Sequence, residues 1–463
     1  MKRRNRFFLA LIAVAIMCVG YVVRGTLLQP PASNTWAPAP GALAQARTGA
    51  AAAALPDGRI LFTGGDPLLA GSTPLATAEF FNPDGSFSVA PSMNYARSKH
   101  TATVLPDGRV LVAGGMDATG NATHTAELFD PVANSWTDAG PLMVPRSGHT
   151  ASLLQDGRVL LAGGENAGAP LNSLEIFDPT TNSFTAATGV LSSARKNHAA
   201  AVLQDGRILV MGGFDGTNVL ATSDLYDPST GQIVAGPMLD VARQQHSATT
   251  LLDGTVLIAG GNAVAQDGSS QDLASAELYN PASGSFLPVT ATLATPRSAH
   301  LAFLLPHNNS VLIVGGTSGG TPVSSVELFM PWTSSFSATG SMATARVGAA
   351  GGSPLSIDGL LVVAGGNSGT GTLASAEAYG FATVKTDKAD YAPGQTVTIT
   401  GSGWQPGETV TLTFLESPNI DTPPPLTAVA DANGNVSNNQ FSPDAYDVGV
   451  LFYLTASGSV SQA

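Results

Sequence analysis

The feature that most constrains this chain is a unit of about 50 residues that recurs seven times. Each unit carries two adjacent glycines, at 64–65, 114–115, 163–164, 212–213, 260–261, 315–316 and 365–366. An arginine precedes each pair: Arg47, Arg97, Arg146, Arg195, Arg243, Arg297 and Arg346. An acid follows each pair: Glu79, Glu127, Glu175, Asp224, Glu277, Glu327 and Glu377. A fixed period of this size indicates a repeat architecture, in which each unit packs on its neighbours.

Each unit predicts four short strands. In the second unit these are "HTATVLP" (100–106), "RVLVAGG" (109–115), "AELFDP" (126–131) and "NSWTDAG" (134–140). Asp107-Gly108 between the first two is a strong hairpin signal, and the second strand is apolar throughout, as a strand buried on both faces should be. Four-stranded units repeated around a channel predict an all-β propeller.

The repeated residues resemble kelch repeats. The resemblance rests on the glycine pair, the acid before an aromatic-Asp/Asn-Pro turn, a fourth-strand aromatic and the arginine before the next unit, and it covers about residues 34–382. It implies a seven-bladed propeller. The seventh unit stops after "AEAYGF" (376–381), whereas "NTWAPAPGALAQAR" (34–47) matches 134–146. We therefore expect the N-terminal strand to complete the last blade and remove its open edge.

The seven arginines and seven acids are predicted to pair in a structural ring. In an up-and-down blade both residues lie at the same end, so a guanidinium and a carboxylate can meet in a bidentate pair. The alternative is an arginine collar that binds anions at the channel mouth. The glycine pairs are predicted to allow a positive φ or close contact between blades.

Five histidines occupy one position in consecutive units: His100, His149, His198, His246 and His300. A ring of imidazoles is a conceivable metal site. The first and seventh units have Ala50 and Ala349 there, however, and blades hold equivalent positions apart. We therefore expect structural histidines, hydrogen-bonded to backbone, and no bound metal.

The sequence assigns no catalytic residue. The enzymatic use of kelch propellers that the resemblance brings in is copper radical chemistry of the galactose-oxidase type, which needs a cysteine cross-linked to a tyrosine. Cys18 is the one cysteine and lies in an N-terminal apolar run, so we expect a protein that is not an enzyme of this type. The alternative is an extracytoplasmic hydrolase or lyase acting on polysaccharide, with paired carboxylates converging from the loops.

The loops that follow the glycine pairs vary in length and sequence, unlike the turns at the opposite ends of the strands. Variable loops on a rigid frame are typical recognition surfaces. The longest is 262–275, which breaks the period. We predict binding of a protein or glycan at this face and no cofactor, with Ca²⁺ as the alternative ligand. The candidate residues are Asp117, His124, Asp215, Asn218, Asp267 and Asp272.

The two ends of the chain are predicted to lie outside the propeller. Residues 1–25 place four basic residues before an uncharged apolar run, which predicts an export signal, expected as an uncleaved membrane anchor with a cleaved signal peptide as the alternative. Residues 26–33 read as a linker. Residues 383–463 alternate Val and Thr around Pro-Gly turns and resemble bacterial Ig-like β-sandwich domains; Trp404 is expected in that core, and an edge strand is missing or lies beyond this sequence.

The net charge and the N-terminal segment indicate which partners and which location to expect. The formal net charge of −13 disfavours nucleic acid as a partner. The N-terminal segment predicts that the rest of the chain works outside the cytoplasm, anchored to the membrane or secreted.

Overall fold

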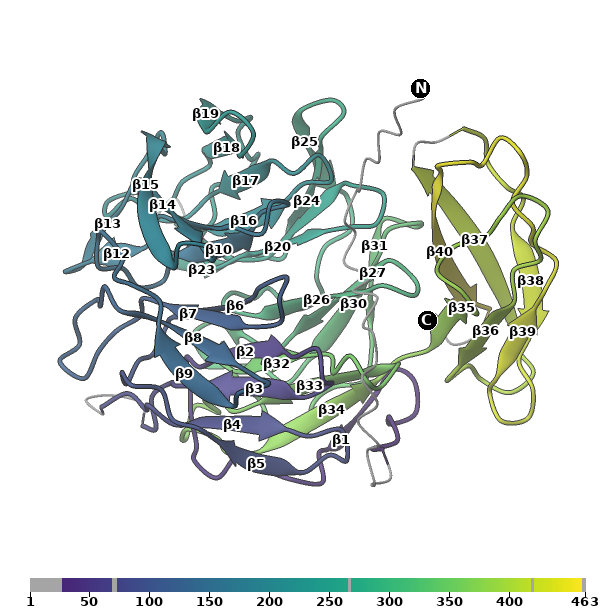
Figure 1. The fold of residues 1–463 in the computed structure, drawn as a ribbon, viewed down its shortest axis with the longest axis horizontal. Helices are drawn as coiled ribbons and strands as arrows, with labels where there is room; N and C mark the ends of the chain where they lie inside the picture. The colour runs from purple at the N-terminus through teal and green to yellow at the C-terminus, as the bar shows by residue number, and fades with distance from the viewer. Residues whose placement is uncertain (1–26, 69–72, 265–267, 418–419, 460–463) are drawn as a thin grey trace.

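The computed structural model describes residues 27–68, 73–264, 268–417 and 420–459. All regular secondary structure in these ranges is β-strand (Figure 1). They contain no helix suited to crossing a membrane. The apolar N-terminal run with Cys18, and Asp267 in the longest loop, lie outside the described residues.

Most of the described chain forms seven four-stranded antiparallel sheets, numbered here in chain order. Sheets 1 to 3 contain β2 (Ala51–Ala54), β3 (Ile60–Thr63), β4 (Ala78–Phe81) and β5 (Phe87–Ala90); β6 (Thr101–Val104), β7 (Val110–Ala113), β8 (Ala126–Asp130) and β9 (Ser135–Asp138); and β10 (Thr150–Leu153), β11 (Val159–Ala162), β14 (Ser173–Asp178) and β15 (Ser183–Val190).

The other four sheets repeat this order. They contain β16 (Ala199–Val202), β17 (Ile208–Met211), β18 (Ser223–Asp227) and β19 (Gln232–Ala235); β20 (Ser247–Thr250), β21 (Val256–Ala259), β24 (Ala276–Asn280) and β25 (Ser285–Val289); β26 (Leu301–Leu305), β27 (Ser310–Val314), β30 (Val326–Met330) and β31 (Ser335–Ala338); and β32 (Ala350–Gly352), β33 (Leu360–Ala364), β34 (Ala376–Gly380) and β1 (Thr35–Pro38).

The first strands of successive sheets contact one another around a common axis (Figure 1). β2 contacts β6, β6 contacts β10, and the contacts continue through β16 and β20 to β26, while β32 contacts β2. Small side chains on these strands, such as the four alanines of β2, let them approach the axis. The second strands are buried along their whole length, as in β7, which explains their unbroken apolar sequence.

Sheet 7 is built from both ends of the repeat region. β1 pairs with β34 in antiparallel register, with Trp36 opposite Tyr379. The two rings pack with centroids 5.2 Å apart, and the Tyr379 hydroxyl donates to Asn34 Oδ1 at 2.9 Å. This pairing covers the edge of β34 that would otherwise be open.

Three of the loops after the glycine pairs contain small hairpins. These are β12 (Glu165–Asn166) with β13 (Ala169–Pro170), β22 (Asn262–Val264) with β23 (Ser270–Asp272), and β28 (Thr317–Ser318) with β29 (Thr321–Pro322). The segment 262–275, the longest of the variable loops, therefore contains the paired strands β22 and β23.

The last part of the chain forms two three-stranded sheets that share one core. One contains β35 (Thr383–Thr386), β36 (Ile399–Ser402) and β39 (Val436–Asn438); the other contains β38 (Leu426–Val429), β37 (Thr409–Ser417) and β40 (Leu451–Gly458). Trp404 is buried in this core. We call these two sheets the C-terminal sandwich.

The C-terminal sandwich is attached to sheet 6 as well as to the end of sheet 7. In sheet 6 the usual Asp-Gly turn is replaced by His307-Asn308-Asn309. The His307 carbonyl accepts from Ala456 N–H of β40 at 2.8 Å, and its Nδ1 lies 2.7 Å from the Val384 carbonyl of β35. Burial lowers the pKa of His307, so its imidazole stays neutral at the junction.

Candidate binding face

Each repeated arginine is buried inside a cluster of acceptors. In sheet 2, Arg97 donates from Nη1 to the carbonyls of Gly114 (2.7 Å) and Thr125 (2.9 Å), and from Nη2 to the Thr125 hydroxyl (2.9 Å) and Glu127 (3.0 Å). Neither charged side chain is exposed. Burial lowers the pKa of Arg97 and Glu127 opposes the shift, so the guanidinium keeps its charge at neutral pH.

The same ion pair recurs in all seven sheets, within one sheet each time. The pairs are Arg47–Glu79, Arg97–Glu127, Arg146–Glu175, Arg195–Asp224, Arg243–Glu277, Arg297–Glu327 and Arg346–Glu377, at 2.6–3.0 Å. Their geometry differs from the bidentate pair expected from the sequence, because only Nη2 reaches the acid. Nη1 is used on two backbone carbonyls instead, so the arginine also ties the glycine pair to the third strand.

The second role of each acid is to hold the backbone that arrives from the preceding sheet. Glu127 accepts the N–H groups of Asn94 (2.6 Å) and Tyr95 (3.3 Å), which follow β5. Asp224 is one methylene shorter and accepts one N–H, from Ser192, whose hydroxyl supplies the second contact at 3.0 Å. Each buried acid therefore fixes the segment that connects the last strand of one sheet to the first strand of the next. We call these connecting segments the rim of the loop face, and the hydrogen bonds from their N–H groups to the acid the clamp. The side chains of the rim point away from the clamp.

The glycine pairs are required where adjacent sheets meet. Gly114 has φ of 61°, and a Cβ there would lie 2.5 Å from the Arg146 carbonyl of the next sheet and 2.8 Å from His149 Cε1. The N–H of Gly115 donates to that same carbonyl at 2.8 Å. Both reasons suggested by the sequence, positive φ and close contact, apply here.

A ring of left-handed residues surrounds the axis at the same face. The residue two positions after each arginine has φ between 51° and 65°: Gly49, Lys99, Gly148, Asn197, Gln245, Ala299 and Gly348. Backbone hydrogen bonds connect several neighbours, including Lys99 N–H to the Gly49 carbonyl at 2.9 Å. This ring of left-handed residues is thus held together by backbone hydrogen bonds.

The five repeated histidines lie between sheets. Nε2 of His149 is 3.0 Å from the Thr101 hydroxyl, and Nε2 of His198 is 3.1 Å from that of Thr150. His100 uses Thr63, and His300 uses Ser247. Nε2 of these four rings thus faces a side-chain hydroxyl on the preceding sheet, a partner that the sequence did not predict. Burial lowers the pKa of His198 to about 3, so these rings are neutral.

The predicted ligand residues of sheets 2 and 4 lie on separate loops and serve their own turns. Asp117 Oδ1 accepts from the Thr119 N–H and hydroxyl and from Asn121 N–H. Asp215 Oδ1 accepts from the N–H groups of Thr217 and Asn218. These hydrogen bonds lower the pKa of both carboxyls, which remain half-buried anions.

The other predicted ligand residues are not gathered either. His124 is exposed, and its carbonyl accepts from Leu142 N–H. Asp272 bridges two sheets, accepting from Asn262 Nδ2 at 3.3 Å and from Gly319 N–H at 2.8 Å. Throughout the described ranges, no three His, Cys, Asp or Glu side chains are grouped so as to hold a metal ion.

Two exposed side chains on this face were not among the sequence candidates. Tyr95 is 41% exposed and Met143 is 62% exposed. Both lie on clamped segments, since their N–H groups donate to Glu127 and Glu175 respectively. The sequence signal that could have identified these two residues is the short variable stretch before each arginine. From the sequence alone this stretch is interpreted as a connecting loop, because its hydrogen bonds to the buried acid are visible only in the structure.

Comparisons with known proteins give the fold. The family profile of the KLHDC2/KLHL20/DRC7 kelch-repeat domain matches residues 85–261, less than half of the chain. The "Structure of YjhT" aligns with 64% of this chain and 98% of that chain, at a TM-score of 0.51 and 15% identity. No curated protein sequence matches significantly.

A second solved structure aligns with nearly the whole chain. It is described as a novel fungal alcohol oxidase with catalytic diversity among the AA5 family, in complex with copper. It covers 95% of this chain and 97% of that chain, with a TM-score of 0.61 and 16% identity. Identity at this level carries over the fold and not the activity.

The described residues do not fit a copper centre. The repeated histidines lie in different gaps between sheets, and four of them direct Nε2 at a hydroxyl. No convergent set of metal-binding side chains occurs in the ranges the structure describes. The profile match and the structural neighbours together show that this chain has an all-β kelch-repeat fold of the propeller type.

Proposed function

We propose that this chain is a binding or scaffold protein, built as a seven-bladed kelch propeller with a C-terminal Ig-like module, that recognises a partner through its loop face outside the cytoplasm. The observation that carries the proposal is the clamp geometry. Seven buried acids hold the rim backbone still, while the side chains that the rim displays differ from repeat to repeat. Recognition surfaces typically combine a rigid backbone with exposed side chains that vary.

The exposed side chains favour a protein partner over a glycan. Tyrosine and methionine are enriched at protein interfaces, and Tyr95 and Met143 stand on clamped segments of neighbouring sheets. Sugar binding would need more exposed aromatic rings, and Tyr95 is the exposed one among the described residues of this face. The loop carboxylates Asp117 and Asp215 belong to loops of different sheets, so these two do not form the carboxylate pair of a polysaccharide hydrolase or lyase.

The test compares two faces of the full chain. Tyr95→Ala with Met143→Ala alters the loop face, and Trp332→Ala with Val132→Ala removes similarly exposed side chains from turns at the opposite ends of the strands. Both double variants and the unaltered protein are screened against a panel of surface proteins and against a glycan array. We expect a protein ligand whose affinity falls at least tenfold in the first double variant and stays unchanged in the second.

Two results would count against this function. A ligand lost only in the turn-face variant would place recognition on the wrong side. Binding confined to the glycan array would replace the protein partner by a sugar.

A further inference from the structure

Leu28, near the start of the described chain, lies at the turn ends of the strands, opposite the loop face. Its N–H donates to the Pro83 carbonyl at 2.8 Å, in the turn between β4 and β5 of sheet 1. Its side chain packs on the core that sheets 1 and 7 share, and a Cβ on Gly85 would lie 3.2 Å from its Cδ1. Leu28 is therefore fixed to one end of the propeller.

The residues that follow reach two other parts of the molecule. Ser33 forms a bridge with Gly380 at the end of β34, and its hydroxyl donates to the Gly403 carbonyl of the C-terminal sandwich. Asn34 N–H donates to the Gly380 carbonyl at 2.8 Å. We call residues 27–34 the strap, because they join sheet 1, sheet 7 and the sandwich.

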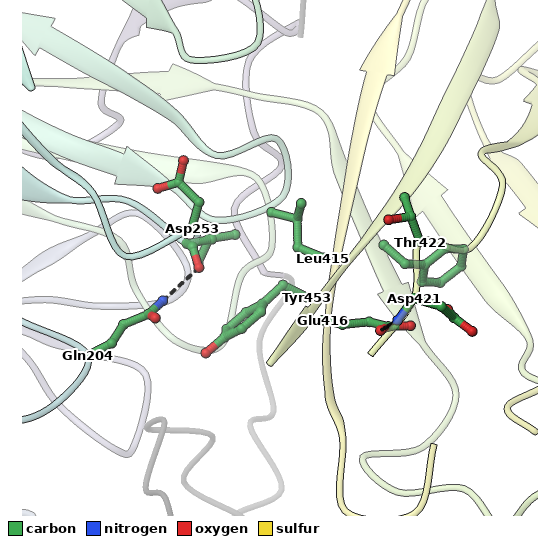
Figure 2. Close-up of a pocket in the computed structure, with 9 residues that line it drawn as sticks. Gln204, Asp253, Leu415, Glu416, Asp421, Thr422 and Tyr453 are labelled. Atoms are coloured by element: carbon green, nitrogen blue, oxygen red, sulfur yellow. Dashed lines mark hydrogen bonds between the residues drawn. The ribbon is translucent and has the colours of Figure 1, made fainter. Parts of the chain in front are cut away.

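The sandwich stands on the same end of the propeller as the strap. Gln204, Leu252 and Asp253, from turns of sheets 4 and 5, line a cavity of about 280 Å³, and Leu415 and Tyr453 of the sandwich line its other side (Figure 2). Figure 1 shows the sandwich beside one end of the propeller and the loop-face strands β12 and β13 at the opposite end. The loop face therefore carries neither the strap nor the sandwich.

Few residues separate the strap from the apolar run that the sequence predicts to be a membrane anchor. Val23 ends that run, and Leu28 follows five residues later. Five residues span at most about 17 Å when fully extended. This reach is shorter than the radius of gyration of a globular chain of this length, roughly 22 Å. A body tethered this closely cannot turn its far end toward the surface that holds it.

The charges of sheet 1 beside the strap do not by themselves attract a lipid surface. Its two turns carry Asp84, whose Oδ1 accepts from the Ser86 N–H and hydroxyl, and the ion pair of Asp57 with Arg59. Surfaces that bind lipid headgroups by charge need clusters of Lys and Arg instead. Orientation at a membrane would therefore come from the length of the tether.

From the fixed strap, its short distance from the apolar run and the position of the sandwich, we infer that the turn ends of sheet 1 face a lipid bilayer and that the loop face points away from it. This inference rests on the proposed function, which places the chain outside the cytoplasm, and on residues 1–25 remaining as an anchor. It narrows the partner to a protein that approaches from the medium or from another surface, rather than a neighbour in the same membrane.

The experiment places the full chain in phosphatidylcholine vesicles and measures how strongly lipids with a nitroxide on the headgroup quench a dye attached to one cysteine. Cys18→Ala removes the native thiol. Ser86→Cys then labels an exposed turn of sheet 1, and Leu68→Cys, at a side chain that is 64% exposed, labels the loop face of the same sheet. We expect at least twofold stronger quenching at position 86 than at position 68.

A longer tether should abolish this difference. A flexible Gly-Ser segment of about 20 residues, inserted between residues 26 and 27, has a root-mean-square end-to-end distance of roughly 25 Å. It should leave both dyes weakly and equally quenched. The same segment appended after Ala463 is the matched control and should preserve the twofold difference.

Four results would overturn the inference. They are failure of the chain to associate with the vesicles, equal quenching of the two dyes without the insert, stronger quenching in Leu68→Cys, and a difference that survives the insert, which would mean adhesion of a surface rather than a tether. None of them involves the ligand. Loss of ligand binding in the Tyr95→Ala and Met143→Ala double variant would leave the quenching unchanged, so this inference and the proposed function can fail separately.

Discussion

At the scale of single residues, one of the five repeated histidines lacks the hydroxyl contact that the other four have. Four of the five histidines meet a hydroxyl on the preceding sheet, but on the sheet that precedes His246 the position equivalent to Ser247 is occupied by Ala199. In the described part of the chain, neither ring nitrogen of His246 has a hydrogen-bond partner. This repeat therefore contains an unsatisfied buried group, which costs stability.

Ala199→Ser should restore the missing contact. The new hydroxyl would stand where Ser247 serves His300, and we expect a gain of about 1 kcal/mol in the free energy of unfolding, measured by urea denaturation. Ala201→Ser, a buried position on the same strand with no histidine to meet, is the control and should lose stability. A loss in Ala199→Ser equal to that of the control would refute this account of His246.

Stability should depend on pH through the same histidines. Burial, and then the nearby arginine charge, lowers the pKa of His198 to about 3, while the unfolded residue titrates near 6.5. Its contribution is complete above about pH 6.5 and is lost as pH falls toward 3, because only the unfolded chain takes up the proton. His198→Ala should flatten the slope of unfolding free energy between pH 6 and 4 by about 1.4 kcal/mol per pH unit.

Alanine is a reasonable replacement because Ala50 and Ala349 occupy this position in sheets 1 and 7. The exposed His124 serves as the control, and His124→Ala should leave the slope unchanged. Identical slopes in the unaltered protein and His198→Ala would show that the buried ring does not resist protonation.

At the scale of elements, the arginine clusters join one sheet to the segment that leaves the previous one. Arg146 reaches two carbonyls and Glu175, and Glu175 in turn accepts the N–H groups of Met143 and Val144. Removal of the arginine alone leaves a buried carboxylate without its cation. Arg146→Met should therefore cost about 3–5 kcal/mol of unfolding free energy.

The double variant Arg146→Met with Glu175→Leu tests the reason for that loss. It removes the stranded charge as well, so its stability by urea denaturation should be no lower than that of the single variant. A single variant within 1 kcal/mol of the unaltered protein would mean that the cluster contributes little beyond packing.

At the scale of the whole molecule, closure depends on one short strand from the beginning of the described chain. Trp36 of β1 packs on Tyr379 of β34, and this contact helps to hold β1 against the edge of β34 that it covers in sheet 7. Trp36→Ala should cost roughly 2–4 kcal/mol and should loosen sheet 7 first, seen as faster amide exchange in β34 than in the equivalent strand β8. Uniform change across all sheets would contradict a local closure.

Much of this fold was readable from the repeats, because an arginine, a glycine pair and an acid at fixed spacing mark equivalent positions. Their partners were harder to read. Thr101 meets His149 from 48 residues away. His149 meets a hydroxyl of the first strand of the preceding sheet, whereas His100 meets Thr63 of the second strand, so the partner depends on how adjacent sheets stack. The cavity at Asp253 could not be foreseen, since it forms only where the C-terminal sandwich rests on sheets 4 and 5.

The strand that completes sheet 7 has a consequence for the order in which this protein acquires its structure. Tyr379 meets Asn34 across 345 residues, and closing a loop of that length costs about 5 kcal/mol of chain entropy. Sheets 1 to 6 can assemble from neighbouring sequence as the ribosome releases it. The ring cannot close until residue 380 has been synthesised, and until then β1 lacks the strand with which it pairs.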